Sequence, residues 1–216
     1  TIWAVATITF FLMNLVPGGP FLSEKAISPA ATKALEAKYG LDKPMAERYF
    51  TYISDAAHGD FGDSLKQRGR TVMDIIATKF PVSAKLGGMA VILALCVGVP
   101  LGVLAAYKRG TFIDSLFSVI ATCGIAVPGF VICTLLLYVF GVKLQWLPTL
   151  GLKNAQSYIM PVVALAAYPT SYIMRLMRSS MLDVLGQDYM RTAKAKGLSQ
   201  KVSLFKHALR NAILPV

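Results

Sequence analysis

The fold of this chain is decided by residues 188–215, which read DYMRTAKAKGLSQKVSLFKHALRNAILP. Tyr189 to Lys196 are good helix formers, and Gly197 follows them directly. Glycine adopts the left-handed conformation at little cost and cations favour a helix C-terminus, so this helix is predicted to end at Gly197. Ser199 is suited to cap a second helix, whose predicted apolar face is made of Val202, Phe205 and Leu209. The stretch therefore predicts two short helices joined at a glycine elbow, with one apolar face and basic residues elsewhere.

Hydropathy identifies the surroundings of this elbow as membrane-spanning. The 216 residues are 55% hydrophobic, with a mean hydropathy of +0.57. A spanning helix needs roughly 20 mostly apolar residues, and spans are expected near 84–107, 113–142 and 156–177. Residues 1–16 are predicted to be a truncated first span rather than a signal peptide, because no small-residue cleavage site follows them. A further span is expected to open at 212–216. The predicted fold class is an all-α, polytopic membrane protein, of which this sequence is a fragment with about four to five spans.

The charge distribution predicts the orientation of these spans. Of the formal net charge of +11, residues 17–80 contribute little, with nine basic and eight acidic side chains, whereas residues 175–210 hold eight basic and two acidic ones. Lys108 and Arg109 occupy the short turn after the second span. The positive-inside rule then puts that turn and residues 178–211 in the cytoplasm, and residues 17–80 outside as a loop with short helices. Because topology explains the basic residues, a nucleic-acid partner is not indicated.

Side chains suited to catalysis or metal binding are not grouped in this sequence. Cys96, Cys123 and Cys133 fall inside apolar segments without disulfide or metal spacing, and are expected to be small core residues. His58 and His207 stand alone, without partners at metal-ligand spacing. No nucleophile-and-base pattern and no phosphate-binding glycine loop is present. We therefore expect no cofactor, no metal and no catalytic residue, and no ATP hydrolysis by this chain.

The elbow also carries a resemblance to a known family. Tyr189-x-Arg191-Thr192-Ala193-x-Ala195-Lys196-Gly197-Leu198, then His207 to Asn211 and Leu214-Pro215, resemble the cytoplasmic loop of binding-protein-dependent ABC importer permeases. Within this family, the stretch most resembles the oligopeptide and dipeptide branch. In particular it resembles the B-type subunit of oligopeptide permeases. The family's usual glutamate before the glycine is absent here, and Arg210 stands where many relatives have proline; both departures fit the peptide branch.

A second stretch, in the predicted outer loop, resembles the same branch. Gly59, Asp60, Phe61, Gly62 and Ser64 resemble the Gly-Asp-Phe-Gly-x-Ser signature of peptide permeases. A plain Gly/Asp-rich surface turn is the alternative interpretation of these residues. The signature follows Gly40-Leu41-Asp42-x-Pro44, whereas Gly19 departs from the family's usual Pro-Gly-Asp-Pro. Helices are predicted at Pro29–Lys38 and Met45–Ala57. Val72–Lys79 is predicted as a separate amphipathic helix, with Ile75, Ile76 and Phe80 against the membrane.

What the resemblance implies is a six-span subunit with the type I ABC importer transmembrane fold, whose core covers residues 81–216. Its expected partners are a homologous second permease, two cytoplasmic ATP-binding subunits that hydrolyse ATP, an extracytoplasmic peptide-binding protein, the peptide and membrane lipid. The expected location is the inner membrane. The expected coupling residues that contact the ATP-binding subunits are Tyr189, Arg191, Thr192, Ala193, Lys196, Gly197, Leu198 and Ser199.

Other functions stay open at this point. Within the ABC importers, dipeptides, nickel or glutathione are alternative substrates. A secondary transporter is disfavoured, because spans two to four lack the intramembrane ionisable residues that ion coupling needs. A non-transporting membrane scaffold gives no reason for the glycine elbow or for a 64-residue structured outer loop.

Overall fold

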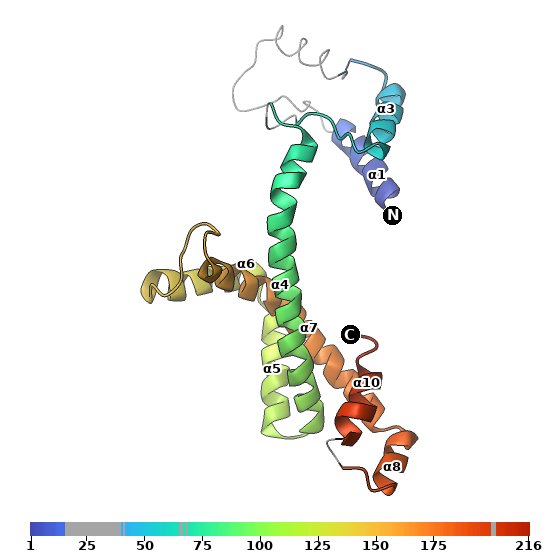
Figure 1. Ribbon diagram of the computed structural model, residues 1–216, viewed down its shortest axis with the longest axis vertical. Helices are drawn as coiled ribbons and strands as arrows, with labels where there is room; N and C mark the ends of the chain where they lie inside the picture. Colours follow the sequence, from blue (N-terminus) through green and yellow to red (C-terminus); the bar gives the residue numbers. More distant parts are fainter. Residues whose placement is uncertain (16–39, 41, 65–66, 68, 200–201) are drawn as a thin grey trace. The chain divides into compact units, whose positions relative to one another are not determined.

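The computed structural model describes residues 1–15, 40, 42–64, 67, 69–199 and 202–216, and for residues 2 and 194 only the backbone. The described chain is helical, with one isolated antiparallel bridge between Asp63 and Thr71, so the predicted all-α class is confirmed. It forms two compact units, residues 1–81 and residues 82–216 (Figure 1). The predicted helix at Pro29–Lys38 and the Pro17–Pro20 exit lie outside the described residues.

In the first unit, aromatic side chains join two helices. These are α1 (Ile2–Leu15) and α3 (Met45–Ala57), the latter with the predicted bounds. Phe10 stacks on Tyr52 with ring centroids 5.7 Å apart, and Phe11 stacks on Tyr49 at 5.5 Å. The Tyr49 hydroxyl lies 2.8 Å from the Thr7 hydroxyl, within hydrogen-bonding distance. Tyr49 and Tyr52 therefore hold α3 against α1.

Helix α4 (Val72–Tyr107) runs for 36 residues and corrects one prediction. A separate amphipathic helix at Val72–Lys79 is wrong, because these residues are the first turns of α4. A proline inside a helix removes one hydrogen bond and crowds the preceding turn. The backbone nevertheless stays helical through both Pro81 and Pro100.

The predicted span at 113–142 is two helices that meet at a sharp bend. These are α5 (Phe112–Ala126) and α6 (Gly129–Leu136), the latter continued by the π-helix η1 (Leu137–Lys143). The bend is 102°. Val127 is extended because the proline that follows it disfavours the helical conformation, so Pro128 accounts for the break.

By length and composition, α4 and residues 155–185 can each cross a membrane, and the bent pair would make a third span. The shorter α1 is apolar as well. The number of spans and the span expected to open at 212–216 stay predictions.

The three cysteines are exposed on their helices, which corrects their expected place in the core. The apolar outer surface of a membrane protein faces lipid or other subunits, so an apolar segment does not imply burial within one chain.

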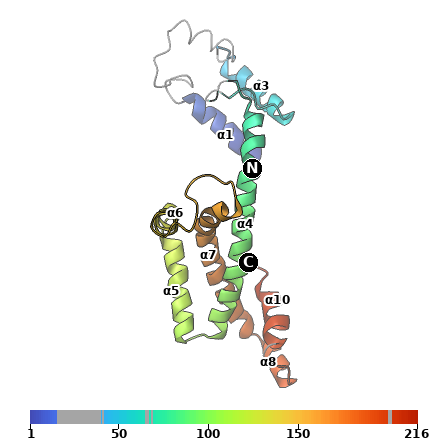
Figure 2. The ribbon, with the colours of Figure 1, turned by 60° about the vertical axis from the view of Figure 1, so that its left-hand side comes forward.

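Helix α7 (Ile159–Leu185), preceded by the short 3₁₀ helix η2 (Ala155–Tyr158), packs against α4 and α5 at glycines (Figure 2). A Cβ on Gly98 would lie 2.8 Å from the Thr170 carbonyl oxygen, and one on Gly102 would lie 2.6 Å from that of Met174. Gly124 of α5 likewise has no room for a side chain beside Ser171. Small residues allow close helix approach in membranes, and these glycines let α7 pack closely on α4 and α5.

Past α7 the chain forms the elbow. It consists of α8 (Asp188–Ala195), the π-helix η3 (Ser203–Ala208) and the single turn α10 (Leu209–Ala212). One buried cluster joins the elbow to the adjoining ends of α4 and α7, and it contains Val103, Ala106, Met177, Met181, Met190, Ala208 and Ala212.

Candidate functional site

The elbow is anchored by a methionine. Met190 of α8 is 1% exposed and belongs to the buried cluster with Val103 of α4 and Met177 and Met181 of α7. Methionine is unbranched and polarisable, so it fills irregular gaps of this kind. Burying one such side chain contributes about 1.5–3 kcal/mol. Helix α8 is therefore packed firmly against the ends of α4 and α7.

The end of α8 has the geometry predicted from its sequence. Gly197 has φ +74°, in the left-handed region. The Leu198 N–H donates to the Ala193 carbonyl at 3.3 Å, and the Lys196 N–H donates to the Thr192 carbonyl at 3.0 Å. The first of these is the long-range bond of a Schellman helix end. A Cβ at Gly197 would meet no atom within 4 Å, so backbone conformation alone selects glycine there.

Ser199 caps the second half of the elbow as predicted, with its hydroxyl accepting from the Val202 N–H at 3.4 Å. The predicted apolar face is wrong for two of its three residues: Val202 and Phe205 are exposed, and only Leu209 is half-buried. Because η3 is a π-helix with i→i+5 hydrogen bonds, its side chains follow a wider period than the α-helical one on which the predicted face was based. Ser203 and Ala208 accordingly both point inward.

A hydrogen bond that the sequence did not predict closes the elbow. The Asn211 side-chain amide donates to the Tyr189 hydroxyl at 3.1 Å and to the His207 carbonyl at 3.0 Å. This bond links α8 to α10 across 22 residues. Tyr189 and Asn211 both belong to the motif, but only the fold brings them together.

Most of the predicted coupling residues are available to a partner. Only Ala193, at 7% exposure, is buried in this chain. The Arg191 Nη1 lies 3.5 Å from the Oδ1 of Asp188, one turn earlier in α8. Because both side chains are solvent-exposed, this ion pair contributes little to stability. The exposed ones are Tyr189, Arg191, Thr192, Lys196, Gly197, Leu198 and Ser199.

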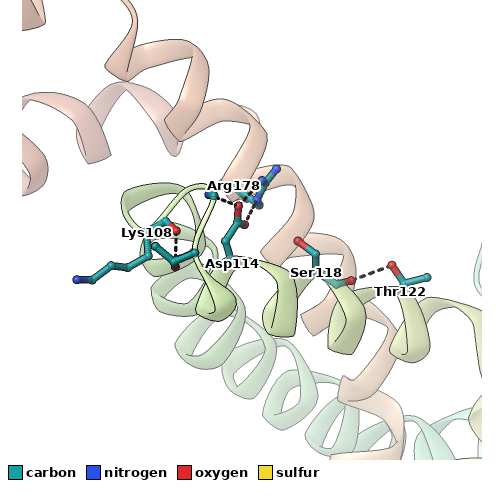
Figure 3. A network of polar contacts seen from close by, with 7 residues as sticks. Lys108, Asp114, Ser118, Thr122 and Arg178 are labelled. Atoms are coloured by element: carbon teal, nitrogen blue, oxygen red, sulfur yellow. Dashed lines mark hydrogen bonds and ion pairs between the residues drawn. The ribbon is translucent and has the colours of Figure 1, made fainter.

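A second polar feature joins α5 to α7 (Figure 3). The Arg178 guanidinium donates to both carboxylate oxygens of Asp114, from Nε at 2.6 Å and from Nη2 at 2.8 Å. The Gly110 N–H donates to the same carboxylate at 3.1 Å, which attaches the 108–111 turn to it. Asp114 is buried, so its charge depends on these donors. Sequence analysis missed this pair, because its members are 64 residues apart and neither belongs to a motif.

The outer-loop signature forms the turn between α3 and α4. Gly59 and Gly62 both have positive φ, of 83° and 71°, and the Gly62 N–H donates to the Asp60 carboxylate at 2.8 Å. Ser64 is buried, and its hydroxyl accepts from the Gln67 N–H at 3.0 Å. Phe61 is exposed. These contacts favour the interpretation of the signature as a structural turn.

Within the described residues, no group of three or more His, Cys, Asp or Glu side chains is placed to hold a metal ion. The elements found are thus a set of apolar helices and an anchored, solvent-facing elbow. Together they define the class as a polytopic membrane protein with an exposed helical elbow.

Comparison with known proteins gives the family. Residues 98–216 match the family described as binding-protein-dependent transport system inner membrane component. The whole chain is 44% identical to the oligopeptide transport system permease protein OppB of Salmonella typhimurium, covering 71% of that protein. It is also 44% identical to the dipeptide transport system permease protein DppB of Bacillus subtilis, covering 70% of it, and 38% identical to DppB of Lactococcus lactis, covering 71%. The chain belongs to this family and is an inner-membrane permease subunit.

Proposed function

We propose that this permease subunit imports peptides and forms half of the translocation pathway together with a second, homologous permease. The oligopeptide permease protein of Salmonella typhimurium and the dipeptide permease protein of Bacillus subtilis are each 44% identical to it. This supports peptides as the substrate class and leaves their length open. The subunit itself carries out no ATP hydrolysis in this proposal. Two cytoplasmic ATP-binding subunits supply the energy.

The observation that carries the proposal is the construction of the elbow. Its inner side is fixed to α4 and α7 through Met190, while Tyr189, Arg191 and Leu198 face outward. Phe205, at 60% exposure, adds an apolar contact that this chain leaves uncovered. A helix that is rigidly attached on one side and open on the other suits the transfer of a partner's motion into the spans.

The orientation of the subunit follows from its charges. Lysine and arginine concentrate on residues 175–210 and on the turn at Lys108, which supports a cytoplasmic elbow and an extracytoplasmic Gly59 turn. The outer side would then receive the peptide from an extracytoplasmic binding protein. Single cysteines at 59 and 108, in a cysteine-free background, test this with an impermeant thiol reagent. Labelling at 59 only is expected in intact cells, and labelling at 108 only contradicts the orientation.

Reconstitution tests the substrate class. The full-length permease, its partner permease, the ATP-binding subunits and the binding protein are placed in proteoliposomes, and uptake of a labelled tripeptide is followed with and without ATP. ATP-dependent uptake that excess unlabelled peptide suppresses is the expected result. Suppression by nickel or by glutathione but not by peptide would replace peptide by that alternative substrate.

A further inference from the structure

Helix α7 carries a polar stripe on its exposed face. Exposed residues recur at three- and four-residue spacing, which places them on one side of a helix. In the apolar first half of α7 they include Ile159 and Leu165. From its middle onward they are Tyr168, Tyr172, Arg175, Ser179 and Asp183, which we call the polar stripe.

The other long apolar helices differ from α7 in this respect. From Met89 to Leu104, the exposed side chains of α4 are all apolar except the thiol of Cys96. On α5 the exposed side chains of Leu116, Val119 and Ile120 are apolar, and the exposed Thr122 hydroxyl donates within the helix to the Ser118 carbonyl at 2.8 Å. Such faces suit lipid or an apolar subunit contact. The polar stripe does not suit lipid, because ionisable and polar side chains in spanning helices face water or protein.

The stripe begins near the middle of the candidate span. The candidate span covers residues 155–185 and has its midpoint at residue 170. Tyr168 and Tyr172 lie two residues on either side, about 3 Å along the axis at 1.5 Å per residue. On the same scale Arg175 is about 7.5 Å from the midpoint of the candidate span, which is within half the thickness of a hydrocarbon core centred there, about 15 Å. This differs from the expectation that spans two to four carry no intramembrane ionisable residue. Neither tyrosine hydroxyl and no side-chain nitrogen of Arg175 has a hydrogen-bond or ion-pair partner among the described residues, unlike the neighbouring Arg178.

The two tyrosines form a flat aromatic surface. Their rings stack with centroids 6.5 Å apart and planes inclined by 13°, and they are 56% and 54% exposed. Pro169 lies between them inside α7. A proline has no N–H to donate, so it releases the carbonyl of Leu165, four residues earlier, as a further acceptor. Two hydroxyls, a free carbonyl and a guanidinium therefore occur within three turns of the helix.

We propose that the polar stripe lines the water-filled path of the transported peptide and that Arg175 is the counter-ion of its carboxylate. Every linear peptide with a free C-terminus carries that anion, and a guanidinium pairs well with it. The tyrosine surface offers hydroxyls to the peptide backbone and ring faces to side chains of any kind. This inference deepens the proposed function and rests on it for the identity of the occupant.

Cysteine accessibility tests the path separately from transport. In the assembled, full-length transporter with its native cysteines replaced, single cysteines are placed at Tyr168, Tyr172 and Val119, the last as the apolar exposed control on α5. A small, charged, water-soluble thiosulfonate is expected to modify 168 and 172 at least about tenfold faster than 119, as hydrated and lipid-facing thiols differ in thiolate formation. Saturating peptide and binding protein should slow the reaction at 172.

Arg175 is tested with peptides that differ only at their C-terminus. The wild type is expected to prefer a tripeptide with a free carboxylate over its amide. Arg175→Gln should lose this preference by about tenfold, the equivalent of one charge-assisted hydrogen bond, and Arg175→Lys should keep most of it. An unchanged preference in Arg175→Gln would overturn the counter-ion role.

The outcomes separate the two proposals. If peptide is taken up but 168 and 172 react as slowly as 119, the stripe is not a water-filled path, and cross-linking of 172 to the second permease would identify it as a subunit contact. If 168 and 172 react rapidly in a transporter that takes up no peptide, the proposed substrate class fails while the water-filled path stands.

Discussion

Replacing Gly197 tests whether backbone geometry at the elbow controls coupling. Gly197 has φ +74°, and a Cβ there would touch nothing within 4 Å. The cost of a side chain is therefore only the left-handed strain, roughly 1–2 kcal/mol for an ordinary residue. A free-energy change of this size alters the ratio of the two states of a two-state element by about 5–30-fold. Gly197→Val should lower the ratio of intact to disrupted elbow by that factor, without preventing insertion of the apolar helices.

The assay is peptide uptake and the stimulation of ATP hydrolysis by loaded binding protein, normalised to the amount of assembled transporter. Asparagine tolerates the left-handed conformation better than alanine or valine, so Gly197→Asn serves as the matched control that also adds a side chain. The expected order of activity is Gly, Asn, Ala, Val. A Val variant that assembles and transports at the normal rate would refute the reasoning. An Asn variant that is as impaired as the Val variant would also refute it, because the defect would then come from the added side chain and not from the backbone conformation.

Three further changes probe the contacts behind the elbow. Gly102→Val should sharply reduce the amount of assembled transporter, because its Cβ would lie 2.6 Å from an α7 carbonyl oxygen; normal assembly would contradict the close packing. Met190→Ala should destabilise the elbow by about 2–5 kcal/mol, seen as a lower inactivation temperature, whereas Met89→Ala at an exposed site should change it little; equal shifts would argue against the anchor. Asp114→Asn and Arg178→Gln should each lower stability, and the double variant should lose less than the sum of the two. Strict additivity in that cycle would show that the two side chains have no interaction energy.

The features predicted well from sequence are those set by neighbouring residues. Helix α3 has the predicted bounds Met45–Ala57, and Gly197 has the predicted left-handed conformation. A proline before a helix, a glycine after one and a capping serine act over a few residues, so their effects can be read locally. In the elbow, the cap at Ser199 is also predicted correctly.

The features that could not be predicted from the sequence depend on residues far apart in the chain or on which of two opposing local preferences prevails. The Asp114–Arg178 pair and the Tyr189–Asn211 bond exist only once the helices pack. The exposure of Phe205 follows from a π-helical turn, which shifts the period on which the predicted face was based. The continuation of α4 through its prolines shows that one lost hydrogen bond did not outweigh the surrounding helical run.

The central claim is that the outer side of the elbow contacts an ATP-binding subunit. Leu198 is exposed directly after the left-handed Gly197, so a photoreactive amino acid placed at 198 reports on that contact. The matched control is the same amino acid at Ile92, an exposed position on α4. In the assembled transporter, irradiation should join position 198, but not position 92, to an ATP-binding subunit, and the yield should change when ATP is bound. No adduct at 198 in a transporter that is assembled and active would contradict the account.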